Sequence, residues 1–108
     1  MSLYRFKSRE TGDLVMLQPS GKRILEILGK DPAGSGILQP AEMPGAIAAL
    51  RAAAADEEAR HQRMKEEAQA NGEPEPQFES VSLRMRIAPF IDMMQRCQKA
   101  DVEIVWGV

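Results

Sequence analysis

The sequence is poor in the residues that build redox, metal and stacking sites. Its 108 residues include one cysteine, one histidine, one tryptophan, one tyrosine and three phenylalanines. A single thiol forms no internal disulfide, so nothing in the sequence points to an oxidising compartment. With aromatic residues at 5%, the bases of a nucleic acid would find few rings on which to stack.

Long apolar runs and a strong excess of one charge are also missing. No stretch approaches the roughly 20 apolar residues of a membrane span, and Met1 to Lys7 contains no apolar run of the kind that a signal peptide needs. The 14 basic and 16 acidic residues give a net charge of −2, whereas nucleic-acid binding requires a basic excess or a basic face. We therefore expect a cytoplasmic protein without a membrane or nucleic-acid partner.

What is present fits an ordinary globular domain. Hydrophobic residues make up 44% and charged residues 28% of the chain, and 108 residues correspond to one domain. The core must consist largely of aliphatic side chains and of the seven methionines, which are flexible and fill irregular gaps. We expect a single domain over residues 1–108.

Short strands are predicted at both ends of the chain. In Leu3 to Lys7, Tyr4 and Phe6 fall on one face. The run Leu14 to Leu17 is continuously apolar, which is typical of a strand covered on both faces, and it would form a hairpin with the first strand. Val102 to Trp106 alternates in the same way and predicts a final strand.

Two helices are predicted in the first two thirds of the chain. Ser20 is a suitable N-cap for a short helix from Lys22 to Leu28, with Gly29 as its left-handed C-terminal residue. After Ile37 and Leu38 return to the core, the composition from Gly45 to Ala70 is strongly helical.

The second helix carries one apolar stripe that changes in character along its length. Met43, Ile47, Leu50 and Ala54 recur at four- and three-residue spacing. The same phase continues through a more polar series, which comprises Glu57, His61, Met64 and Ala68. We therefore expect the first half of this helix to pack against the core. The second half is expected to be solvated, or to dock against another surface through its narrow apolar stripe. A flexible linker is expected at residues 71–79, which contain Gly72, Pro74 and Pro76.

The segment from Val81 to Asp101 has two readings. Residues 81–87 alternate as in a strand, which would place the start of the following helix near Pro89. A longer helical stripe through Leu83, Ile87, Phe90, Met94 and Cys97, with Ser82 as its cap, favours a helix kinked at Pro89.

These elements predict an α+β fold. We expect a small three-stranded, mostly antiparallel sheet, made of the N-terminal hairpin and the C-terminal strand. One face of the sheet would be covered by a short helix, a long helix and a proline-kinked C-terminal helix.

Several stretches together resemble a known family. They are Tyr4-Arg5-Phe6-Lys7-Ser8, Gly12 to Leu17, Arg23 to Asp31, Val81 to Arg84 with Pro89, and Val105-Trp106-Gly107. Over nearly the whole chain the pattern resembles a family of short bacterial proteins, the domain of unknown function eighteen-forty. That family brings no established activity and no recognised catalytic residues, so the resemblance implies a small cytoplasmic bacterial domain and no mechanism.

One motif fragment suggests anion binding. Ser20-Gly21-Lys22 follows a predicted strand and opens a helix, where backbone N–H groups and the helix dipole attract phosphates. A Walker motif would need glycine at position 16 and Ser or Thr at position 23, but Met16 and Arg23 stand there. The alternative is an ordinary capped turn with basic side chains at the surface.

A second fragment suggests a metal. Glu58 and His61 have the Glu-x-x-His spacing that places two ligands on one helix face. Because His61 is the sole histidine, such a site would need a second copy of the chain in a symmetric dimer. The alternative is a solvated helix face whose charges pair at i,i+4 spacing, such as Asp56 with Arg60.

No catalytic residue, resident metal or cofactor is predicted. Cys97 lies on an apolar stripe without a neighbouring base, which favours a buried small hydrophobe over a nucleophile. The pattern as a whole favours a non-enzymatic protein-interaction module, with a protein partner or a second copy docking on the stripe of Met43, Ile47, Leu50 and Met64. A small ligand- or anion-binding domain or enzyme, using Ser20-Gly21-Lys22 or the dimeric Glu58/His61 site, is the alternative.

Overall fold

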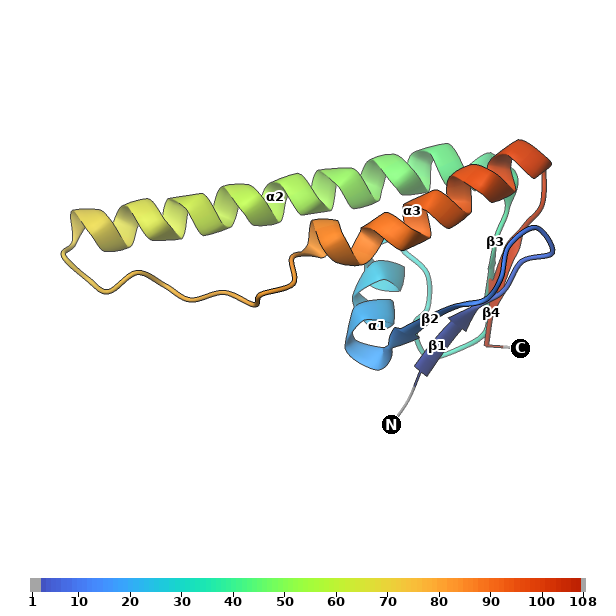
Figure 1. The fold of residues 1–108 in the computed structure, drawn as a ribbon, viewed down its shortest axis with the longest axis horizontal. Coiled ribbons are helices and arrows are strands. Elements are labelled where there is room, and N and C mark those ends of the chain that lie inside the picture. Colours follow the sequence, from blue (N-terminus) through green and yellow to red (C-terminus); the bar gives the residue numbers. More distant parts are fainter. Residues whose placement is uncertain (1–2, 108) are drawn as a thin grey trace.

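A computed structural model describes residues 3–107 and shows an α+β fold (Figure 1). Three α-helices and two small antiparallel sheets are described. In chain order the elements are β1 (Leu3–Phe6), β2 (Leu14–Leu17), α1 (Gln18–Ile27), β3 (Gly36–Leu38), the 3-10 helix η1 (Pro40–Glu42), α2 (Met43–Ala70), α3 (Leu83–Ala100) and β4 (Ile104–Trp106). None of the helices within residues 3–107 is both long and apolar enough to cross a membrane.

The predicted three-stranded sheet is wrong, because the strands form two separate pairs. β1 pairs with β2, as expected for the hairpin, whereas β4 pairs in full register with β3. The two sheets meet at one bridge, in which Lys7 and Val105 exchange both backbone hydrogen bonds at 2.8 and 2.9 Å. β3 has only three residues and begins at Gly36, too short a run for its alternation to mark a strand.

The first helix begins earlier than the sequence predicts. α1 starts at Gln18 directly after β2, with Leu17 at the N-cap and no side-chain cap. Pro19 causes no loss there, because proline in a first turn lacks only an N–H that has no helical partner. The expected N-cap role of Ser20 is therefore wrong, although Gly29, with φ of 73°, does adopt the left-handed conformation predicted for it.

β2 is not covered on both faces as its apolar run predicts. Met16 is buried, but the side chains of Val15 and Leu17 are 44% and 53% exposed. Ile37 of β3 was expected in the core and is 41% exposed, while Leu38 beside it is buried as expected. Both differences arise because the helices cover only the inner face of each sheet.

The core lies where the helices meet that inner face. The ring of Phe6 lies 4.7 Å from that of Phe90 and 5.7 Å from that of Trp106, measured between centroids. The predicted α2 stripe is confirmed, since Met43, Ile47, Leu50 and Ala54 are all buried. The structure also decides the ambiguous segment in favour of the helix. Ser82 caps α3 by accepting a bond from the Met85 N–H, and the five predicted stripe residues are buried.

The second half of α2 extends beyond the rest of the molecule. Figure 1 shows α2 as one long helix, with α3 beside its first half only. The chain then returns along the second half as an extended segment of residues 71–82, which we call the strap. The strap includes residues 71–79, the predicted flexible linker, and it contacts the polar continuation of the α2 stripe at His61.

Candidate functional site

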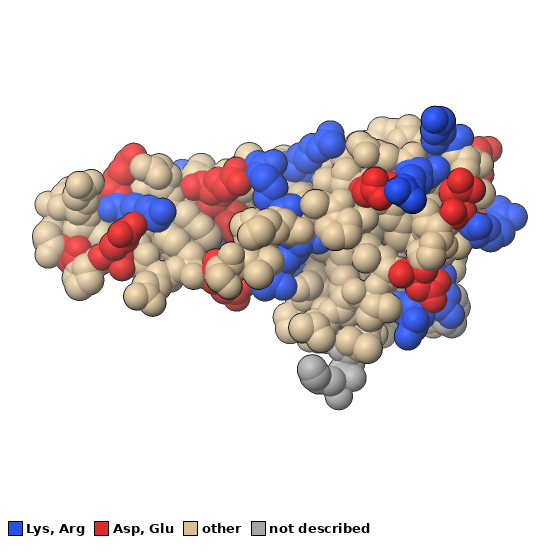
Figure 2. Space-filling model, viewed as in Figure 1, with Lys and Arg blue, Asp and Glu red and all other residues tan. Residues whose placement is uncertain are grey.

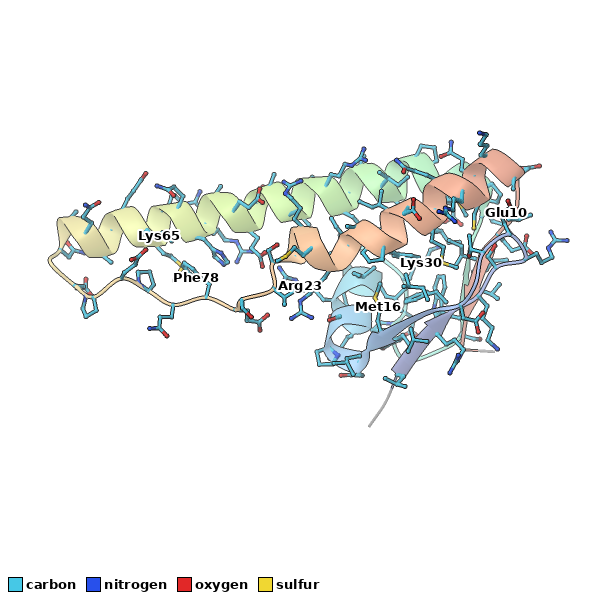
Figure 3. All side chains as sticks on the ribbon, in the orientation of Figure 1. Glu10, Met16, Arg23, Lys30, Lys65 and Phe78 are labelled. Carbon is cyan, nitrogen blue, oxygen red and sulfur yellow. The ribbon has the colours of Figure 1, made fainter. Side chains whose placement is uncertain are left out.

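Two surfaces qualify as candidate sites, and the first is a polar groove. We call it the polar junction, since α1, α2, the strap and the start of α3 meet there (Figure 3). The groove has a volume of about 510 Å³. Its lining residues are Arg23, Glu57, Arg60, His61, Gln77, Phe78, Glu79, Val81 and Ser82.

Glu57 holds the polar junction together. Its carboxylate accepts a 2.9 Å bond from the backbone N–H of Leu83, the first residue of α3, and a 3.2 Å bond from Arg23 of α1. Burial alone would raise the pKa of the Glu57 carboxyl, but the bonds from Leu83 and Arg23 outweigh it and leave the pKa below its ordinary value. Glu57 therefore remains a carboxylate that ties three helices.

Two further ion pairs lie beside the junction. Arg84 donates two 2.8 Å bonds to Glu58, which lowers the pKa of Glu58 and raises that of Arg84. Arg86 donates to the hydroxyl of Ser20 and, at 3.3 Å, to Glu79. These contacts use the groups that a ligand would need, so the junction is best explained as a connection between elements.

The predicted metal pair is not brought together within one chain. Glu58 faces Arg84, whereas the His61 ring stacks on Phe78 of the strap, with 3.7 Å between centroids and 7° between planes. Among residues 3–107, no three His, Cys, Asp or Glu side chains gather as a metal-binding group. A site shared by two copies stays a prediction.

The predicted anion-binding turn at Ser20-Gly21-Lys22 is not formed. Ser20, Gly21 and Lys22 lie inside α1, so they do not form a turn that opens a helix. The Ser20 hydroxyl already accepts from Arg86, and Gly21 is buried against the ring of Tyr4.

The residues predicted to form an interface fall into two groups. Met43, Ile47 and Leu50 are buried within the chain's own core. Met64, in contrast, is 47% exposed on the far part of α2. Of the four, only Met64 is open to a partner in this arrangement. Cys97 is fully buried and donates to the Ser8 hydroxyl at 3.1 Å, in keeping with the buried role that its stripe favours.

The second candidate site is the outer face of the sheets. Leu3 and Leu17 are cross-strand partners, and Val15 lies two residues from Leu17 on the same side. Their side chains are 44% to 54% exposed. Ile37, paired with Val105, continues this side onto the second sheet. We call these residues the outer sheet face: Leu3, Val15, Leu17, Ile37 and Val105.

Two basic side chains share this surface, because Arg5 lies opposite Val15 and Lys7 opposite Val105. Figure 2 shows basic and acidic side chains interspersed over most of the molecule, but few of either sign over α1 and the adjoining start of β1. Arg5, which shares the face, pairs with Asp13 at 3.5 Å. An antiparallel sheet normally presents polar side chains to water on its open face, and the exposed aliphatic residues here depart from that pattern.

The sequence contained a weak signal for this surface. Residues 14–17 are all apolar, although a strand with one open face should alternate. An unbroken apolar run is also typical of a strand that is buried on both faces. Only the position of the helices reveals which side lacks a cover within the described part of the chain.

Comparison with known proteins yields one match. A family model described as a domain of unknown function (DUF1840) matches residues 2–106. No curated protein matches the chain, and no solved structure does.

Proposed function

The chain belongs to the family of the domain of unknown function DUF1840, and from this premise we propose that it is a non-enzymatic protein-interaction module of the bacterial cytoplasm. The family description names no activity. The location is proposed from the single cysteine, which forms no internal disulfide.

The observation that carries the proposal is the outer sheet face. Leu3, Val15, Leu17 and Ile37 are each more than 40% exposed. Contact of these apolar side chains with water is unfavourable. A partner that covered them would stabilise the complex by about 25 cal/mol for each Å² of apolar area removed from water. Docking through this face is a function that needs no catalytic group.

The polar junction supports the same proposal, because its charged groups bond mainly to one another. Its carboxylates and most of its guanidinium groups are bound to one another. A catalytic pair would instead be expected to leave at least one group poised toward a substrate. In this proposal the polar junction holds the helices together, and the outer sheet face binds the partner.

The proposal is tested by affinity capture from the native host with three baits. The wild-type chain is compared with Leu3→Lys, which places a charge within the outer sheet face. Met64→Lys is the matched control, because Met64 has a similar exposure but lies on α2.

We expect proteins that the wild-type and Met64→Lys baits hold and that the Leu3→Lys bait loses. Identical capture by all three baits, or no specific capture by any of them, would contradict the proposal. Circular dichroism of each bait shows that the fold is retained.

A further inference from the structure

We propose that a second copy of the chain docks at the β2 border of the outer sheet face, where two copies pair antiparallel along their β2 strands about a two-fold axis at Val15. This inference deepens the proposed function and rests on it. It is derived from the backbone groups that β2 leaves unpaired.

The direction of these groups follows from the observed bridge. Lys7 bonds to Val105, so its N–H and C=O point toward β4. Successive residues of a strand point to opposite sides, so Phe6 and Tyr4 point toward β2, where their partners are Leu14 and Met16. Val15 and Leu17 must then direct their backbone groups away from β1, along an edge on which no other described strand lies.

The β2 edge is short, but it lacks the charges, prolines and bulges that keep many strands from pairing further. Natural sheets protect their edges with charges, prolines or bulges. Residues 14–17 contain no charge and no proline, and their pairing with β1 runs through four consecutive residues without a bulge. An edge of this kind is a template for another strand.

A second β2 fits this template in a definite register. The two-fold axis must pass through a residue and not between two residues. Only then do the N–H and C=O groups that point away from β1 in one copy lie opposite the same groups of the other copy. Leu17 is the N-cap of α1, and an N-cap carbonyl accepts the first hydrogen bond of its helix. Only the N–H of Leu17 is therefore available to a second strand. With the axis at Val15, the two Val15 residues exchange two hydrogen bonds. Each Leu17 N–H then donates to the Asp13 carbonyl of the other copy.

The side chains agree with this register. Val15 would lie beside Val15 of the other copy on the outer sheet face, with Leu17 of each copy diagonal to it and Leu3 behind. No like charges lie opposite each other, because Asp13 faces Leu17 of the other copy. The contact is small, so we expect a reversible dimer that dissociates on dilution.

The opposite edge is a poorer candidate and serves as a control. Val105 points toward β1, so Ile104 and Trp106 bond to β3 through Leu38 and Gly36. Only Ile37 directs its backbone groups outward. β3 thus offers one residue to a new strand where β2 offers two.

Sedimentation equilibrium over a wide concentration series tests the pairing. Val15→Pro removes the two central hydrogen bonds and leaves the β1–β2 ladder intact, because the Val15 N–H faces outward. We expect the wild-type chain to dimerise reversibly and Val15→Pro to raise the dissociation constant about tenfold or more. Ile37→Pro is the equivalent change at the other edge. Ile37 shares the outer sheet face, but β1 and β4 separate its strand from β2, so this variant should leave the dissociation constant unchanged. A wild-type chain that stays monomeric throughout, or equal effects of the two prolines, would overturn the inference.

A cysteine variant keeps the test decisive if Val15→Pro does not fold. At the two-fold axis the Val15 Cα atoms should lie about 5.5 Å apart, within the range of a disulfide. Val15→Cys should therefore form a covalent dimer on mild oxidation. Leu17→Cys should not, although Leu17 is the more exposed of the two. Equal cross-linking of both variants, or none of Val15→Cys, would overturn the register.

Failure of this inference can be separated from failure of the proposed function. If the wild-type chain is monomeric while the Leu3→Lys bait still loses a protein that the wild-type bait holds, another protein is the partner. In that case the inference falls and the proposed function stands.

Discussion

Glu57 shows how one side chain can join segments that are distant in the sequence. Its carboxylate bonds to Arg23, 34 residues before it, and to the Leu83 N–H, 26 residues after it. The helical phase predicted that Glu57 would continue the α2 stripe, and it is indeed buried. Its two partners were beyond prediction, because periodicity describes one helix and contains no information on what packs against it.

Replacing Glu57 should destabilise the fold measurably. Glu57→Gln removes the charge that pairs with Arg23 and weakens the bond to the start of α3, so we expect a loss of about 1–3 kcal/mol in the free energy of unfolding. Urea titration measures the loss. Glu67→Gln, an exposed change on the same helix, should stay within about 0.5 kcal/mol. Equal effects of the two variants would contradict the role assigned to Glu57.

The pH dependence of stability follows from the same group. The pKa of Glu57 is lowered in the folded chain, so the folded state binds fewer protons than the unfolded state. The contribution of Glu57 is therefore present above the pKa of an unfolded glutamate, about 4.3, and is lost as the pH falls through the lower folded pKa. Chemical unfolding at a series of acidic pH values should show wild-type stability falling more steeply than that of Glu57→Gln. Parallel curves would argue against this linkage.

Two helical glycines should respond in opposite directions to the same change. A Cβ on Gly21 would lie 2.6 Å from Cγ of Tyr4, whose hydroxyl is bonded to the Pro32 carbonyl at 2.6 Å. Gly21→Ala should therefore cost about 1–3 kcal/mol. Gly45 has no atom within 4 Å of such a Cβ, so Gly45→Ala should stabilise by about 0.4–1 kcal/mol. Thermal unfolding compares them, and a stabilised Gly21→Ala would contradict the close packing of α1 on β1.

The elements were predictable to the extent that their own periodicity identifies them. The stripes of α2 and α3 span many turns, so helix type and buried face followed from the sequence. Strand pairing did not, because the bridge between Lys7 and Val105 joins residues from opposite ends of the chain. The start of α1 was missed because Pro19 fits the end of a strand as well as the first turn of a helix.

The strap is the element whose attachment is easiest to test. The stack of Phe78 on His61 and a 4.0 Å ion pair between Lys65 and Glu75 hold it along α2. Phe78→Ala should therefore speed hydrogen exchange in residues 71–82 and change global stability little. Gln77→Ala, an exposed neighbour, is the control. An unchanged exchange rate in Phe78→Ala would show that the stack does not hold the strap.

For the molecule as a whole, the sequence predicted a docking surface on the α2 stripe, and three of its four residues, Met43, Ile47 and Leu50, lie in the chain's own core. An apolar stripe on a helix fits an external partner and an internal one equally well, and α3 covers most of the α2 stripe. The outer sheet face became visible only when the helices were placed, since the apolar run of β2 is compatible with cover on either side.

The most direct test of docking through β2 is residue-resolved hydrogen exchange at low and at high protein concentration. If two copies pair through β2, the amides of Val15 and Leu17 exchange more slowly as the concentration rises, while the amide of Ile37 does not change. If Val15 and Leu17 exchange equally fast at every concentration, or if the slowing appears on the second half of α2 instead, the docking surface lies elsewhere.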